Sequence, residues 1–178
     1  PLSRRQRQMC IRDSSMSFTA WLYIDQAMNN MRILDMAVGH DDENIMIGPI
    51  GTTNRMFAWW LDDTAGGGRE EHHQDNVVDY AQWFHFSATI DGGGTTGARM
   101  TVYKNGTFVG RSGADKSPPD NITRGQQWLG RGAYQWTPYF KGKMDDIRLY
   151  QGDLTAAEVS SIYAETAPPV AATIGSLY

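Results

Sequence analysis

Hydrophobic and polar residues alternate along most of this chain, with the two-residue period of a β-strand that buries one face. The alternation is clearest at 17–25 and at 83–91. In these two segments one face carries only apolar side chains, namely Phe18, Ala20, Leu22, Ile24, Phe84, Phe86, Ala88 and Ile90. Both segments are therefore predicted to be strands that pack this face into a hydrophobic core.

Shorter segments of strand type follow one another between turn residues. Strands are predicted at 31–36, 44–48, 55–63, 126–130 and 140–150. Residues 99–110 are predicted to form a hairpin, because the Asn105-Gly106 pair suits a type I′ turn, which needs positive φ at both central positions. Many short strands with turns between them predict an all-β, antiparallel jelly-roll sandwich.

The end of the chain carries two more detailed signals. Residues 154–163 are predicted to form one short helical turn, with Thr155 as N-cap and Glu158 completing a capping box. The strand before it places Asp145 in register with Ile147 and Leu149. The Asp145 carboxylate is therefore expected on the buried face, where it needs a hydrogen-bond donor or a metal ion.

The first residues stand apart from this pattern. Residues 3–14 resemble a translated sequencing adapter of the kind left in metagenomic assemblies, so 1–13 are predicted to be non-native, with a basic, disordered arm as the alternative. The net charge of the whole chain is −4, from 16 basic and 20 acidic residues. Leaving out 1–13, with four arginines and one aspartate, leaves 12 basic and 19 acidic residues, a net charge of −7, and no cysteine.

This composition excludes two classes of protein. An acidic chain without a basic cluster is a poor candidate for nucleic-acid binding. No apolar run is long enough to predict a membrane span.

Four motifs, in this order, resemble laminin-G-like domains of the concanavalin A-like lectin/glucanase superfamily. They are SFTAWLYID (17–25), QWFHFSATID (82–91), MTVYKNGTFVG (100–110) and WLGRGAYQWTPYFKGKMDDIRLY (128–150), the last resembling the family's closing hairpin. The resemblance implies one sandwich domain at 14–164, followed by a linker at 165–178 toward a further domain of the same polypeptide. Family members usually begin with an additional strand, so this copy is predicted to lack its N-terminal strand and to expose a sheet edge.

The resemblance also implies a structural calcium ion. In the related jelly-roll glucanases an aspartate of the last strand helps to hold calcium, and Asp145 occupies the similar position. Calcium takes several oxygen ligands, and in those relatives the partner ligands come from the N-terminal strand that this chain is predicted to lack. The alternative is that Asp145 accepts backbone N–H groups.

Catalytic residues are not indicated. Retaining glycosidases need two carboxylates about 5–5.5 Å apart, and none of the five glutamates begins the Glu-x-Asp-x-(x)-Glu strand pattern. The chain is therefore predicted not to be an enzyme. EEHHQD (70–75) concentrates metal-ligating residues, but adjacent histidines on an extended chain point in opposite directions, and a solvated loop is predicted. His85 is expected to be packed and hydrogen-bonded rather than catalytic.

Aromatic residues just before the last strand are the candidate ligand site. Sugars are held by aromatic rings that stack on their C–H faces, with a few polar groups. AYQWTPYF (133–140) places Trp136, Tyr134 and Tyr139 in a loop. Trp59 and Trp60 are further candidates, because adjacent strand residues cannot both face inward. The alternative is that these rings cover the edge of the sandwich.

The sequence thus predicts a non-catalytic carbohydrate-binding or adhesion module of a larger secreted or surface microbial protein. Its partner would be a glycan or a cell-surface or extracellular protein, and its location extracellular or at the cell surface, as the family resemblance implies. The alternative is a structural spacer or protein–protein interaction domain with no sugar site. A degenerate glycoside hydrolase is the third hypothesis.

Overall fold

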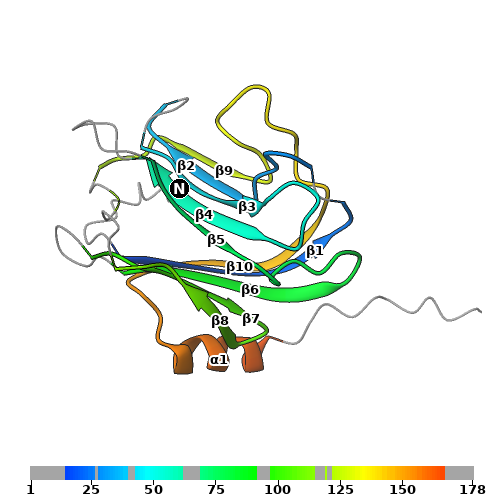
Figure 1. Cartoon of the computed structure of the whole chain (residues 1–178), viewed down its shortest axis with the longest axis vertical. Helices are drawn as coiled ribbons and strands as arrows, with labels where there is room; N and C mark the ends of the chain where they lie inside the picture. Colours follow the sequence, from blue (N-terminus) through cyan, green and yellow to red (C-terminus); the bar gives the residue numbers. More distant parts are fainter. Residues whose placement is uncertain are drawn as a thin grey trace, which may run out of the picture.

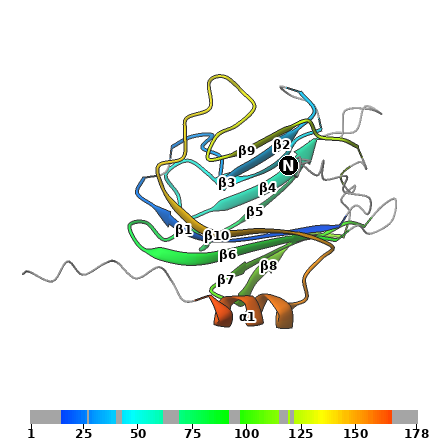
Figure 2. The ribbon, with the colours of Figure 1, turned by 180° about the vertical axis from the view of Figure 1, so that it is seen from behind.

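The computed structural model describes residues 15–26, 28–39, 43–61, 69–91, 97–114, 119 and 122–166. Within these residues ten strands form two five-stranded antiparallel sheets that face each other, and one helix lies outside them (Figures 1 and 2). The predicted all-β jelly-roll sandwich is confirmed. No helix in the described ranges is long and apolar enough to cross a membrane.

The first sheet, sheet A, has the strand order β10-β1-β6-β7-β8. These strands are β1 (Met16–Ile24), β6 (Trp83–Ile90), β7 (Met100–Lys104), β8 (Thr107–Arg111) and β10 (Gly142–Gln151). The apolar faces predicted for β1 and β6 do form the core: Phe18, Leu22, Phe84 and Phe86 are at most 1% exposed. Each such side chain contributes about 1.5–3 kcal/mol by leaving water.

The second sheet, sheet B, has the strand order β5-β4-β3-β2-β9. Its strands are β2 (Leu34–Ala37), β3 (Ile45–Pro49), β4 (Met56–Leu61), β5 (Arg69–Gln74) and β9 (Gln126–Leu129). Strand β5 contains most of the segment predicted to be a solvated loop, so that prediction is wrong. Its side chains are mostly polar because β5 is the outermost of these five strands, and its backbone is ordered by pairing with β4.

The predicted turn and helix start are both confirmed. Asn105 and Gly106 have φ of +49° and +74°, as a type I′ turn requires. Helix α1 (Ala156–Glu165) begins with the predicted capping box between Thr155 and Glu158, and it is ten residues long rather than a single turn. It covers the outer face of sheet A (Figure 1) with Val159 and Ile162 buried.

The closing strands do not form a hairpin. Strand β9 pairs with β2 in sheet B, whereas β10 pairs with β1 in sheet A. The chain between them crosses from one sheet to the other, as the yellow segment of Figure 1 shows. We call this segment, residues 130–141, the aromatic loop. The expectation of a closing hairpin is therefore wrong, because each strand finds its hydrogen-bond partner far away in the sequence.

The register of β10 also differs from the prediction. Thr19 of β1 pairs with Arg148, but Trp21 pairs with Asp145, so β10 carries one extra residue opposite β1. This β-bulge includes Asp146, whose φ is +46°. The bulge reverses the alternation, so that Asp145 is exposed on the outer face while Leu149 packs against the core and Ile147 is partly exposed. The expectation of a buried Asp145 is therefore wrong.

Candidate functional site

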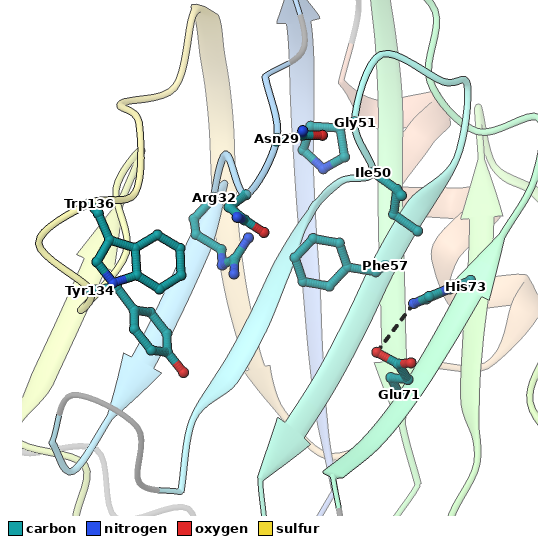
Figure 3. Close-up of a pocket in the computed structure, with 11 residues that line it drawn as sticks. Asn29, Arg32, Ile50, Gly51, Phe57, Glu71, His73, Tyr134 and Trp136 are labelled. Carbon is teal, nitrogen blue, oxygen red and sulfur yellow. Dashed lines mark ion pairs between the residues drawn. The ribbon is translucent and has the colours of Figure 1, made fainter.

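A pocket of about 380 Å³ opens beside the outer face of sheet B (Figure 3). Strands β4 and β5 form one side of it, and the aromatic loop forms the other. The chain before β2 and the turn after β3 close its end with Asn29 and Gly51. Five separate stretches of sequence therefore meet at this pocket.

Phe57 lies at the centre of the pocket. Its neighbour Ala58 faces the core, so the alternation of β4 turns the Phe57 ring to the outer face. The ring packs with Met46 and Tyr134 in a small cluster of its own, separate from the main core. Gly48, paired with Phe57 in the next strand, has no room for a side chain, since a Cβ there would collide with the carbonyl oxygen of Met31 and would lie 3.2 Å from a ring carbon of Phe57.

Arg32 supplies a fixed positive charge next to this ring. The side chain is only 4% exposed, and its guanidinium carbon lies 4.8 Å from the centroid of Phe57. Its Nε donates a hydrogen bond to Met46 Sδ at 3.2 Å. In Figure 3 the guanidinium points into the space between Phe57 and the aromatic loop. The site thus combines an apolar base with a cation held in place by packing.

The polar wall of the pocket comes from β5. Glu71 and His73 alternate on the strand and share its outer face, and His73 Nε2 lies 3.3 Å from Glu71 Oε2 (Figure 3). Both side chains are about one-third exposed, so their outward-facing atoms remain accessible to a ligand. Among the described residues that line the pocket, Glu71 is the only carboxylate.

The aromatic wall comes from two residues that the sequence predicted. Trp136 is 62% exposed, Tyr134 is 7% exposed, and their ring centroids lie 5.0 Å apart. Trp136 therefore offers an open aromatic face, while Tyr134 anchors the loop to the cluster around Phe57. Asn29 and Arg32, across from Trp136, bring hydrogen-bonding groups to the same space (Figure 3).

The other predicted ligand residues lie elsewhere. Tyr139 is 69% exposed but does not line the pocket; its ring lies 5.8 Å from the guanidinium carbon of Arg131, which also lies over Trp128 at 4.2 Å. Trp59 and Trp60 are on β4, paired with Met46 and Ile45, and their side chains lie outside the described residues. Their role in binding stays a prediction.

Sequence reasoning missed the other lining residues of the pocket, among them Arg32, Phe57, Glu71 and His73. For Phe57 a signal existed, because the alternation of 55–63 separates it from Met56 and Ala58. For Glu71 and His73 the same alternation was present, but a run of charged and polar residues does not indicate which face is covered. Nothing in the local pattern places Arg32 beside the aromatic loop.

His85, on the outer face of sheet A, is packed as predicted but without the predicted hydrogen bond. It is 1% exposed, lies 5.3 Å from the ring of Trp21 and 5.8 Å from that of Tyr163, and neither ring nitrogen has a hydrogen-bond partner among the described residues. Burial lowers its pKa to about 4, and Asp146 and Arg148 act on it with opposite sign.

The contacts of Asp145 favour the alternative over a calcium ion, whose binding stays a prediction. Asp145 Oδ1 accepts the backbone N–H of Asp146 at 2.8 Å, which agrees with the alternative expected for this residue. The neighbouring Asp146 carboxylate pairs with Arg148 at 2.8 Å, and that guanidinium would repel a cation. Within the described ranges, no three His, Cys, Asp or Glu side chains lie close enough together to hold a metal ion between them.

We therefore expect calcium to leave the stability of the fold unchanged. The melting midpoint of the chain should be the same in 1–2 mM EDTA as in a similar excess of CaCl₂, concentrations of the order that saturate extracellular calcium modules. Differential scanning fluorimetry measures this directly. A rise of several degrees in CaCl₂ that Asp145→Asn removes would contradict the expectation and assign the ion to Asp145.

The fold and the pocket together define the class of this protein, a concanavalin A-like jelly-roll sandwich with a cleft beside one sheet. A family model described as "Concanavalin A-like lectin/glucanases superfamily", of the laminin-G type, matches residues 5–160. The chain belongs to this family, which confirms the resemblance of its motifs. No curated protein matches the chain in sequence.

Solved structures with the same fold include several sugar-binding proteins. Domain 4 of the extracellular arabinanase AbnA from Geobacillus stearothermophilus, in complex with arabinotriose, has a TM-score of 0.63 and 21% identity over 85% of this chain and 67% of that one. The CBM40 of the Ruminococcus gnavus IT-sialidase, bound to α2,3-sialyllactose, has a TM-score of 0.67 and 12% identity over 86% and 84%. A heptameric SAP-like pentraxin from Limulus polyphemus has a TM-score of 0.57 and 16% identity over 85% and 70%.

Proposed function

We propose that this chain is a non-catalytic carbohydrate-binding module and that the pocket between the aromatic loop and β5 holds the glycan. The observation that carries the proposal is the open ring of Trp136, 62% exposed, at the rim of a pocket that also presents a guanidinium, a carboxylate and an imidazole. An aromatic platform with a few convergent polar groups is the arrangement that sugar recognition requires.

The charged side chains that line the pocket favour sugar binding over sugar hydrolysis. Glycoside hydrolysis uses a pair of carboxylates on either side of the scissile bond. Glu71 is the only carboxylate among the described lining residues, and it is already paired with His73. The pocket can therefore hold a sugar by stacking and hydrogen bonds without an acid and a base to cleave it. The solved relatives that bind arabinotriose and α2,3-sialyllactose support the same function.

The module would act outside the cell or at its surface, as part of a larger microbial polypeptide. By binding a glycan it would keep the attached domains close to that glycan. This setting is the one in which sugar-binding relatives such as the domain of an extracellular arabinanase occur.

Trp136→Ala tests the proposal. The purified chain is screened against a glycan panel that includes arabinotriose and α2,3-sialyllactose, and the dissociation constants of the bound glycans are measured by isothermal titration calorimetry. Removing a tryptophan on which a ligand depends commonly costs about 2 kcal/mol, a loss of about 30-fold in affinity. Trp136 has few contacts to the core, so the melting midpoint should not move.

Two control variants make the result specific. Phe108→Ala removes another exposed aromatic side chain, 53% exposed on β8 of sheet A, and should leave affinity unchanged. Tyr139→Ala removes the exposed ring of the aromatic loop that does not line the pocket and should have a much smaller effect than Trp136→Ala. A folded chain that binds nothing across the panel would favour the spacer hypothesis instead.

A further inference from the structure

A carboxylate lies completely buried beneath the pocket. Asp35, in the middle of β2, is 0% exposed, and its strand partners are Met46 on one side and Trp128 on the other. Burying a carboxylate costs free energy unless hydrogen bonds and nearby charges compensate it. Its neighbours Leu34 and Met36 face the main core, so Asp35 lies on the outer face of sheet B, on the side of the aromatic loop.

Its contacts reach directly into the aromatic loop. Asp35 Oδ2 accepts the backbone N–H of Ala133 at 2.8 Å, and Oδ1 accepts a hydrogen bond from Asn44 Nδ2 at 3.3 Å. Arg32, the cation of the pocket, stabilises its negative charge. Burial raises the pKa of Asp35 above its ordinary value of 3.8, while these three neighbours oppose that rise.

Ala133 is the residue before Tyr134, so this bond acts where the loop enters the pocket. The base of the loop is closed separately, by hydrogen bonds from Phe140 N to Gly130 O at 2.7 Å and from Gly130 N to Ile33 O at 2.9 Å. Its tip is a turn in which both N–H and Oγ1 of Thr137 donate to Tyr134 O. Between base and tip, the Asp35 carboxylate connects the loop to sheet B.

Atoms pack closely around the hydrogen bond between Asp35 and Ala133. A Cβ at Gly132 would lie 2.7 Å from Thr137 Oγ1 and 3.2 Å from Arg32 Cγ. The loop backbone therefore passes close to both its own tip and the pocket cation. A shift of Ala133 away from Asp35 would move Tyr134 off Met46 and Phe57, and would carry Trp136 with it.

We propose that Asp35 is a positioning residue of the pocket: by holding the Ala133 amide, it fixes Tyr134 and Trp136 opposite Phe57 and Arg32. It touches no ligand and acts through the backbone of the loop. The inference rests on the proposed function for its effect on glycan affinity, but its effect on the loop can be measured without any ligand.

The ligand-free test is nuclear magnetic resonance on the full chain, labelled with ¹⁵N, following the Ala133 amide and the Trp136 indole N–H, the latter assigned with Trp136→Phe. Asp35→Leu removes both acceptors, and both signals should move or broaden. Asp35→Asn keeps an acceptor but removes the charge. Charged acceptors make hydrogen bonds about twice as strong, so the weaker bond in this variant should move the Ala133 signal upfield. The Trp136 signal should stay close to its wild-type position. Unchanged signals in both variants would overturn the proposal. If Asp35→Leu does not fold, an unmoved Ala133 signal in Asp35→Asn overturns it.

The binding test uses arabinotriose and α2,3-sialyllactose as probes. Asp35→Leu should lower affinity about tenfold or more, because it leaves the Ala133 amide without its partner, and Asp35→Asn should recover most of that loss. Val102→Ala, in the core of sheet A at 2% exposure, is the control for general destabilisation and should leave affinity unchanged.

The two proposals can fail separately. If Trp136→Ala abolishes binding and Asp35→Leu leaves the affinity intact, the positioning role is wrong and the carbohydrate function stands. If neither probe binds the wild type but the Trp136 signal moves in Asp35→Leu, the positioning role stands and the proposed function loses its support.

Discussion

Lowering the pH from 7 to 4 is expected to destabilise the fold by about 3 kcal/mol through His85 alone. The imidazole is buried between Trp21 and Tyr163, beneath α1, and burial lowers its pKa from 6.5 to about 4. In the unfolded chain the same residue takes up a proton near pH 6.5. Between these two pH values the unfolded state binds more protons than the folded state, so stability falls as the pH falls.

Urea denaturation at pH 7 and at pH 4 measures this loss, with His85→Phe as the matched variant. Phenylalanine keeps an aromatic ring against Trp21 and Tyr163 but cannot be protonated. Asp35 has the opposite effect on stability. Its pKa is raised in the folded state, so as the pH falls the folded state binds a proton before the unfolded state does, and this contribution to stability rises. Subtracting the pH-dependent loss of stability of His85→Phe from that of the wild type removes the contributions of Asp35 and of the other titrating groups that the two proteins share. Equal acid sensitivity in the two proteins would show that His85 is not the cause.

Gly142→Ala is expected to cost about 4 kcal/mol, enough to unfold a large share of a marginally stable domain. Gly142 is the glycine that begins β10, with φ of +153°, in a region that only glycine adopts readily. A Cβ at this position would collide with the carbonyl oxygen of Tyr23, and it would also lie 3.0 Å from the ring of Phe140. The carbonyl of Tyr23 is difficult to move, because Tyr23 belongs to β1, which pairs with a strand on each side.

Two other glycines separate the contributions of collision and backbone strain. Gly152 has φ of +100° but nothing within 4 Å of an added Cβ, so Gly152→Ala should cost only about 1–2 kcal/mol. Gly125 has open space around it and no positive φ, so Gly125→Ala should be nearly neutral. The measurement is the free energy of unfolding from urea titration. A Gly142→Ala variant no less stable than Gly152→Ala would refute the collision argument.

Most of the sandwich could be predicted from the sequence because burial dictates a simple period. Strands β1 and β6 are central strands of sheet A, so their inward positions are uniformly apolar and the alternation is easy to see. The turn at Asn105-Gly106 and the capping box at Thr155 are local in sequence, and both were predicted correctly. Features determined by a few adjacent residues are the ones that a single sequence specifies best.

Features that depend on partners distant in sequence were missed. The bulge at Asp146 arises from the way β10 meets β1, and its effect was to move Asp145 to the opposite face from the predicted one. Strand β5 was missed because an outer strand with a polar sequence resembles a loop until its partner β4 is known. The aromatic wall of the pocket, Tyr134 and Trp136, was predicted from one segment of sequence. Arg32 and Glu71 come to the same pocket only through the topology of sheet B.

The bulge in β10 has a consequence for how copies of this chain meet one another. Strand β10 is the outermost described strand on its side of sheet A. A regular edge would offer an unbroken row of N–H and C=O groups on which a second sheet could dock and grow. Asp146 interrupts that row at φ +46°, and the exposed charges of Lys143 and Asp145 lie beside the interruption. The irregularity that places Asp145 on the outer face should thus oppose self-association through this strand.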